Sequence, residues 1–186
     1  SGGITRIRGI NEIVRAVGLL ANDMKIKLIL AGSFEPLQLK DEVSRQEGWE
    51  RVKYYGWQPR NKLADLLANT RVGLVLFHPA PNHIEAQPNK LFEYMSAGIP
   101  VVASDFPLWR RIVEGAGCGL LVDPKDSAAI AGAIQWLLEH PKEAAAMGQR
   151  GQQAVEKRYN WEIEAVKLVK YYRERIMLSV IETRYK

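Results

Sequence analysis

The sequence has a single cysteine, Cys118, among its 186 residues, which excludes an internal disulfide framework. No apolar run approaches the ~20 residues that a helix needs to cross a bilayer. A secretory signal peptide is also missing, because the chain opens on Ser1-Gly2-Gly3 and is polar and basic by Arg6. These absences predict a cytoplasmic protein.

Features of nucleic-acid-binding modules are missing as well. The sequence has no zinc-ligand spacing, no interleaving of aromatic and basic residues and no helix-turn-helix punctuation. The net charge of +5 and the pI near 9.3 therefore indicate anionic small ligands or an anionic membrane surface rather than nucleic acid. Part of the excess charge lies in the last third of the chain, where a solvated helix face is the simpler interpretation.

The residues that are present are those of an ordinary globular domain, with 47% hydrophobic and 25% charged side chains. Short β-favouring runs predict strands at residues 25–32, 52–56, 72–77, 101–103 and 120–122. Between and after them, helical periodicity with Asn11 and Asp126 as caps predicts helices near residues 11–20, 37–47, 61–69, 89–97, 108–113, 126–140, 142–157 and 161–181.

This alternation predicts an α/β fold: a doubly wound, Rossmann-like parallel sheet with helices on both faces and extra helices at the carboxyl end. We interpret residues 1–186 as one domain, with a body at 1–158 and a final helix within 159–186. Such sheets bind ligands at the loops that follow the carboxyl ends of their strands. The polar loop between residue 77 and the helix starting at residue 89 is therefore the main candidate site.

Two pairs of side chains in and beside this loop could carry chemistry. His78 and His83 are candidate proton carriers, but the sequence shows no partner for either and no metal-ligand spacing. Glu85 and Glu93 would lie ~12 Å apart in one continuous helix, which is too far for one small site. If the loop folds back, both carboxylates could accept hydrogen bonds from vicinal sugar hydroxyls. Two glutamates at this spacing also occur by chance.

Two positively charged groups are candidates for an anion site. Arg6 and Arg8 lie in a glycine-rich start, where guanidinium forks suit a diphosphate, although two solvated arginines would give the same pattern. The segment Pro88-Asn89-Lys90 opens a helix, and the free N–H groups near Asn89, Lys90 and Leu91 attract an anion. An ordinary helix start with an exposed lysine is the alternative.

At this point the sequence resembles a known family. The pair Glu85-x7-Glu93, followed by residues 92–104, is similar to the Glu-x7-Glu region of retaining glycosyltransferases of the GT-B type, the group 1 or family 4-like enzymes. Further segments of the chain match the donor-binding domain of that family in order: the start through Arg8-Gly9, and residues 28–32, 52–56, 119–124 and 158–162. Together these segments extend the resemblance over essentially the whole chain.

The resemblance implies a carboxyl-terminal domain that binds a nucleotide-diphospho-sugar, such as a UDP- or GDP-sugar. We expect no metal or other cofactor, because Arg8, Lys90 and the helix N–H groups would supply the positive charge that a cation would otherwise give. It implies that Glu93 takes the ribose hydroxyls and that Glu85 lies beside the donor sugar as the catalytic residue. It places Arg8 at the diphosphate and the loop at Gly56 against the base. Asn89, Lys90 and Leu91 complete the expected donor-binding residues.

The sequence departs from the family at two places. Gly3 stands where relatives usually have an arginine, and we expect Lys90 to replace that contact. Residues 86–89 replace a Gly-Phe-Gly type of turn, which leaves the donor sugar open. An amino-terminal acceptor domain does not fit within 186 residues, so the chain is expected to be inactive in transfer by itself.

Two other functions remain open from the sequence: a sugar-nucleotide epimerase, which shares the two-domain plan, and a non-catalytic nucleotide-binding regulatory module. For a glycosyltransferase, the basic charge fits a glycan or lipid-linked acceptor at the inner membrane surface, by analogy.

Overall fold

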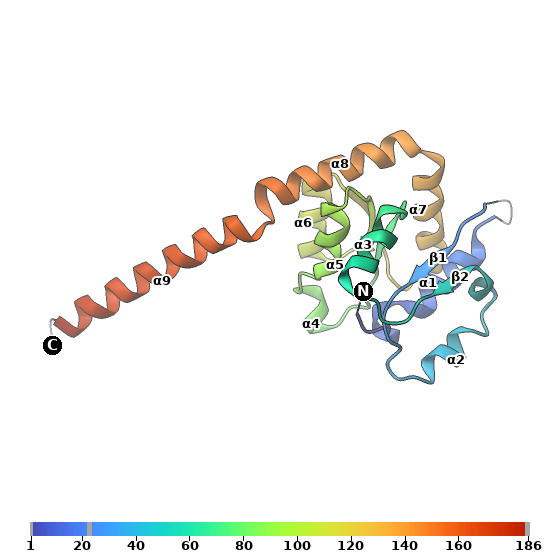
Figure 1. The fold of residues 1–186 in the computed structure, drawn as a ribbon, viewed down its shortest axis with the longest axis horizontal. Helices are drawn as coiled ribbons and strands as arrows, with labels where there is room; N and C mark the ends of the chain where they lie inside the picture. The colour runs from blue at the N-terminus through green and yellow to red at the C-terminus, as the bar shows by residue number, and fades with distance from the viewer. Residues whose placement is uncertain (1, 22–23, 185–186) are drawn as a thin grey trace.

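The computed structural model describes residues 2–21 and 24–184, with side chains as far as residue 175 (Figure 1). Its strands are β1 (Leu28–Leu30), β2 (Val52–Tyr54), β3 (Gly73–Val75), β4 (Val101–Ser104) and β5 (Gly119–Val122). Every pairing is parallel, as predicted. Hydrogen bonds arrange the strands in two ladders, β1-β2 and β3-β4-β5, rather than in one continuous sheet.

Helices separate the strands and then complete the chain, which confirms the predicted α/β order. The α-helices are α1 (Ile10–Leu19), α2 (Leu39–Val43), α3 (Arg60–Ala68), α4 (Pro81–Ile84), α5 (Asn89–Ser96), α6 (Pro107–Ala116), α7 (Ser127–Glu139), α8 (Pro141–Arg158) and α9 (Trp161–Arg184). Two 3-10 helices, η1 (Arg6–Arg8) and η2 (Glu47–Arg51), precede α1 and β2. Asp126 caps α7 as predicted, because its side chain accepts the N–H groups of Ala128 and Ala129.

Helices cover both faces of the β3-β4-β5 ladder. Successive strand residues point to opposite faces, and β4 divides its side chains accordingly. Val101 and Ala103 lie in a core with residues of α5, α6 and α8, whereas Val102 lies in a second core with residues of α1 and α7. A third core joins α1 and α2 to β1 and β2. This double covering leaves the carboxyl ends of the strands as the open edge.

Three local predictions were wrong. Gly9, with φ 68°, stands at the N-cap of α1, and Asn11 lies inside the helix, where it accepts a hydrogen bond from Gln46 at 3.2 Å. The helix expected at residues 37–47 spans only Leu39–Val43, and η2 begins at Glu47. The polar loop after β3 contains the short helix α4.

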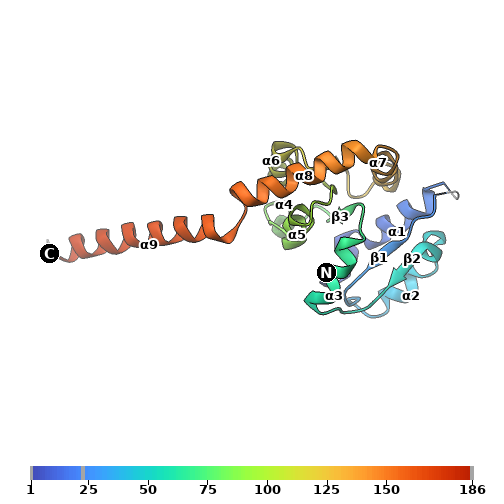
Figure 2. The same cartoon turned by 45° about the horizontal axis from the view of Figure 1, so that its top comes forward.

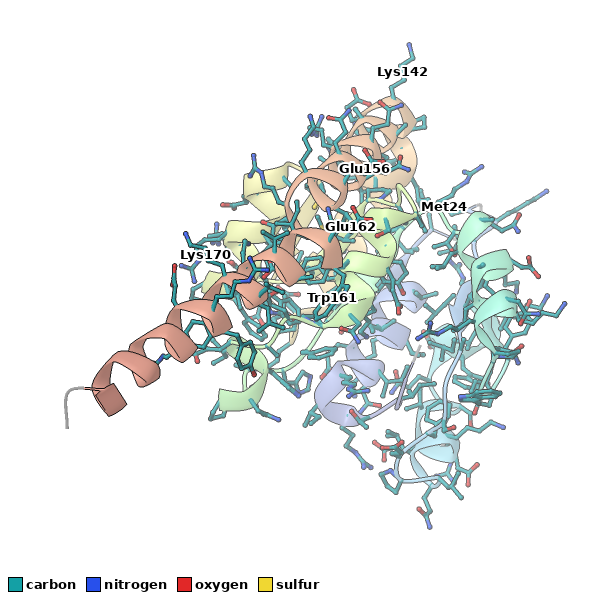
Figure 3. The ribbon with its side chains drawn as sticks, turned by 60° about the vertical axis from the view of Figure 1, so that its left-hand side comes forward. Met24, Lys142, Glu156, Trp161, Glu162 and Lys170 are labelled. Atoms are coloured by element: carbon teal, nitrogen blue, oxygen red, sulfur yellow. The ribbon has the colours of Figure 1, made fainter. Side chains whose placement is uncertain are left out.

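The final helix, α9, extends away from the body in both views (Figures 1 and 2). Figure 3 marks Trp161 at its start and Lys170 further along. Among its apolar side chains, Trp161 is 72% exposed and Val166 is 70% exposed. None of the described helices combines the length and apolar character required to span a membrane.

Candidate functional site at the carboxyl edge of the sheet

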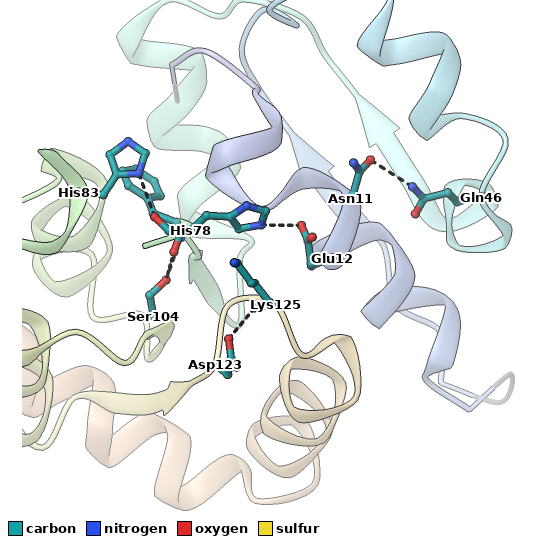
Figure 4. A network of polar contacts seen from close by, with 9 residues as sticks. Asn11, Glu12, Gln46, His78, His83, Ser104, Asp123 and Lys125 are labelled. Atoms are coloured by element: carbon teal, nitrogen blue, oxygen red, sulfur yellow. Dashed lines mark hydrogen bonds and ion pairs between the residues drawn. The ribbon is translucent and has the colours of Figure 1, made fainter. Parts of the chain in front are cut away.

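Phe77 lies just beyond β3, at the carboxyl end of that strand. The Ser104 hydroxyl, at the end of β4, donates to the Phe77 carbonyl at 2.9 Å and accepts the Phe77 N–H at 2.8 Å (Figure 4). The ring of Phe77 is 6% exposed and belongs to the core around α5 and α6. Two neighbouring strand ends are thus joined, and the ring is held in a fixed place.

Two positively charged side chains from distant parts of the chain lie over this ring. The Arg8 Cζ is 5.5 Å from the Phe77 centroid, and the Lys90 Nζ is 4.8 Å from it. A cation over an aromatic face is weakly attracted, but the two cations repel one another. Burial, followed by the charge of Arg8, lowers the pKa of Lys90 to about 8, and Glu93 opposes the shift. An anion between the two cations would relieve this repulsion.

Of the two predicted arginines, only Arg8 reaches this site. The Arg8 guanidinium donates to the Gly3 carbonyl at 2.8 Å, which orients it along the glycine-rich start. Arg6 pairs instead with Glu42 of α2, and its side chain is half exposed. Of the two arginines whose role the sequence left open, Arg6 is thus bound by a carboxylate on a neighbouring element.

The start of α5 supplies backbone donors beside Lys90. Pro88 is the N-cap and Asn89 begins the helix. The N–H of Leu91 donates to the Pro88 carbonyl at 3.0 Å and its side chain is fully buried, so Leu91 is not the free donor that the sequence predicted. The orphan N–H groups of the first turn are thus those of Asn89 and Lys90.

Glu93 lines an open hollow one turn further along α5. The hollow has a volume of ≈ 560 Å³ and is lined by Leu67, Asn89, Phe92, Glu93, Ser96, Ala97 and Tyr159. Glu93 itself is exposed. Burial, together with the charge of Glu93, raises the pKa of the neighbouring Tyr94 to about 12. The lining of the hollow therefore combines a carboxylate and an amide of α5 with apolar side chains of α3 and α5.

Glu85 and Gly56 lie elsewhere on the carboxyl edge. Glu85 follows α4, is exposed, and donates its N–H to the His83 carbonyl. Gly56 follows β2 with φ 66°, and its carbonyl accepts the Gly32 N–H at 2.8 Å. Neither residue lines the hollow beside Glu93. The structure thus brings Arg8 and Lys90 together over Phe77, and it brings Asn89 and Glu93 together in the hollow. Glu85 and Gly56 belong to neither group.

Both histidines have partners that the sequence did not reveal (Figure 4). His78 Nε2 is 3.1 Å from a carboxylate oxygen of Glu12 on α1, and His83 Nδ1 is 3.1 Å from the His78 carbonyl. These contacts join residues of separate elements, for which local sequence has no signal. Within the described part of the chain, no group of three or more His, Cys, Asp or Glu side chains is arranged to hold a metal.

Comparison with solved structures defines the class of this fold. Sucrose-phosphate synthase of Thermosynechococcus elongatus superposes with a TM-score of 0.80 over 95% of the chain, at 26% identity. Anabaena HepE, solved in complex with UDP, has the same TM-score over 93% of the chain, at 19% identity. The chain covers 46% and 48% of these two proteins, respectively. The fold is thus the Rossmann-like half of a GT-B glycosyltransferase.

Sequence comparison then identifies the family. Residues 1–154 match the family Glycosyl transferases group 1, and the chain belongs to that family. The O-antigen chain mannosyltransferase B of Escherichia coli is 31% identical over 161 residues, which are 83% of this chain and 40% of that protein. The chain therefore spans less than half the length of the relatives and structures named here.

Proposed function

We propose that this chain binds the nucleotide-diphospho-sugar donor of a glycosyltransferase that retains the anomeric configuration. The convergence of Arg8 and Lys90 over Phe77 carries the proposal, because a diphosphate is the anion that such a site would accept. The UDP in the structure of Anabaena HepE supports a nucleotide as the ligand. This function also follows the Glu-x7-Glu resemblance of the sequence.

Each group has a role in the proposed complex. Arg8, Lys90 and the N–H groups of Asn89 and Lys90 hold the diphosphate, and they stabilise the charge that develops as the nucleoside diphosphate leaves. Glu93 accepts hydrogen bonds from the ribose hydroxyls, and the loop at Gly56 lies against the base. Glu85 lies beside the sugar and orients it for transfer. The cationic side chains supply positive charge at the diphosphate, so the proposal includes no metal or other cofactor.

The acceptor requires a second half of the enzyme in this proposal. The E. coli relative is more than twice as long as the matched segment, which leaves room for an acceptor domain. We propose that α9 is the segment that crosses to this domain, because its apolar side chains are exposed on the isolated chain. A glycan or lipid-linked acceptor at the inner membrane surface fits the name of the O-antigen relative and the basic charge.

The proposal is tested by titrating the chain with UDP-, GDP- and ADP-sugars in a calorimeter. We expect selective binding to one base, lost in Glu93→Ala and weakened roughly 5- to 150-fold in Lys90→Ala, which corresponds to about 1–3 kcal/mol for a charge-assisted hydrogen bond. Lys142→Ala is the matched control, because Lys142 is an exposed lysine at the far end of α8 (Figure 3).

Two results would contradict the proposal. Nucleotide-sugar affinities that are unchanged in both Glu93→Ala and Lys90→Ala would remove the assigned site. Sugar transfer to an acceptor by this chain alone would contradict the assignment of acceptor binding to a separate domain.

A further inference from the structure

The position of Glu85 is determined by its backbone. Its side chain is exposed, and no hydrogen bond or ion pair holds its carboxylate within the described part of the chain. Its main chain, in contrast, is fixed on both sides, at His83 before it and at Ala86 after it. The two attachments converge on the Phe77 ring that also lies beneath Arg8 and Lys90.

His83 provides the first attachment. It is 7% exposed on α4, and its Nδ1 lies 3.1 Å from the His78 carbonyl, so that nitrogen carries the proton and donates. The His83 ring lies 4.9 Å from the Phe77 ring, and its carbonyl accepts the Glu85 N–H. The turn that bears Glu85 is thereby anchored to the end of β3.

Trp109 provides the second attachment. It is fully buried on α6, and its indole N–H donates to the Ala86 carbonyl at 2.7 Å. Its ring meets the Phe77 ring edge-on at 5.4 Å and the Phe106 ring at 4.9 Å. A buried indole needs an acceptor, and here that acceptor is the peptide directly after Glu85.

We propose that His83 and Trp109 are positioning residues that place the Glu85 carboxylate relative to the cations over Phe77. This inference rests on the proposed function, in which Glu85 contacts the donor sugar and the cations hold the diphosphate. The Phe77 ring contacts both the residues that hold the Glu85 backbone and the two cations. The core therefore fixes the distance between Glu85, at the sugar, and the cations, at the diphosphate. A displacement of Glu85 therefore weakens binding of the sugar and leaves binding of the nucleotide unaffected.

The test compares two affinities in the same chain by calorimetry. UDP and UDP-glucose, and GDP and GDP-mannose, are titrated, and the pair that binds the wild type is used. We expect Trp109→Phe, which removes the N–H and keeps an aromatic ring, to weaken nucleotide-sugar binding about 5- to 10-fold, the value of one hydrogen bond. Binding of the nucleoside diphosphate stays within about twofold. Trp136→Phe on α7 is the control, since that ring stacks on His140 at 4.5 Å, away from the site.

Further variants separate this inference from the proposed function. His83→Phe keeps a ring against Phe77 but removes the donor to the His78 carbonyl. It is expected to show the same selective loss of sugar affinity, and it provides the test if Trp109→Phe does not fold. Glu85→Gln tests the sugar contact itself. If Glu85→Gln loses sugar affinity but Trp109→Phe and His83→Phe do not, the positioning role is wrong. If Glu85→Gln leaves the preference for nucleotide sugar unchanged, or the wild type has none, the role proposed for Glu85 is wrong, and the inference with it.

Discussion

At the scale of single residues, the surroundings of Lys90 favour the anion contact that is proposed for it. Its Nζ lies 4.8 Å from the Phe77 centroid, with Arg8 on the same ring, and its pKa falls to about 8 because the amine is buried beside a second cation. A bound diphosphate favours the charged amine and raises that pKa again. In the proposed complex, ligand binding and protonation of Lys90 are therefore coupled.

This coupling predicts a pH dependence with a definite sign. At pH 7 the free protein already carries the charged amine, so nucleotide-sugar affinity is high. As the pH rises through about 8, the free amine loses its proton and binding must restore it, so affinity falls by up to about tenfold per pH unit. Calorimetry in two buffers of different ionisation enthalpy measures the proton uptake.

Lys90→Arg is the matched variant for this prediction, because a guanidinium stays charged over the same range. It is expected to keep the affinity measured at pH 7 within about threefold and to abolish the pH dependence. A wild-type affinity that stays constant from about pH 7 to 9 would show that Lys90 does not contact the anion.

Residues with a local signal could be predicted from the sequence, and residues with distant partners could not. Arg8 in a glycine-rich start and Lys90 at a proline-led helix start were recognisable, because the reason for each lies within a few neighbouring residues. The pairs His78–Glu12 and Trp109–Ala86 join separate elements, and only the folded chain brings them together. The prediction that Leu91 offers a free N–H was wrong, because this N–H donates to the Pro88 carbonyl. That hydrogen bond depends on the backbone geometry at the start of α5, which the sequence does not reveal.

At the scale of elements, α8 packs closely against α5, the helix that carries Lys90 and Glu93. A Cβ at Gly148 of α8 would lie 1.9 Å from the carbonyl of Gly98, just after α5. A Cβ at Gly151 would lie 3.1 Å from the Cys118 Cβ, and 3.5 Å from Met95 of α5. The contact at Gly148 therefore requires a residue without a Cβ. The order of elements was predictable from periodicity. The contact of Gly148 with the Gly98 carbonyl was not, because the sequence of α8 has the pattern of an ordinary polar helix.

The contact predicts opposite effects for two glycine substitutions in helices. Gly148→Ala is expected to destabilise the chain by about 1–3 kcal/mol, since backbone atoms must move to admit the methyl group. Gly132→Ala in α7 has nothing within 4 Å of the new Cβ and is expected to stabilise by up to about 1 kcal/mol through helix propensity. Urea denaturation measures both. Equal effects of the two variants would contradict the proposed close contact.

At the scale of the whole molecule, the body and α9 are built differently. The body has three cores, whereas the described side chains of α9 are almost all exposed (Figures 1 and 2). The family match ends at residue 154, before α9 begins. The described residues thus distinguish a body with buried cores from a helix whose apolar side chains, as far as residue 175, are largely exposed.

Deleting α9 tests this division. A chain that ends at Asn160 keeps Tyr159 in the hollow and keeps the hydrogen bonds from Asn160 to Val155 and Glu156 that end α8. We expect its Tm to stay within about 2 °C of the full chain, because the described side chains of α9 are almost all exposed and contribute little to stability. In a domain of this size, the Tm shifts by about 2–4 °C per kcal/mol. Its nucleotide-sugar affinity should stay within about twofold. Self-association, measured by analytical ultracentrifugation, should fall, since Trp161 at 72% and Tyr172 at 58% exposure are removed.

A second truncation serves as the contrast. Ending the chain at Glu139 also removes α8, whose buried Ala144, Gly148, Gly151 and Ala154 contact the body, and we expect this shorter chain to lose cooperative unfolding. If the chain ending at Asn160 lost stability or nucleotide-sugar affinity to a similar extent, α9 would be part of the folded domain. The helix would then act within this half of the enzyme, and its exposed apolar side chains would require an explanation other than a crossing to an acceptor domain.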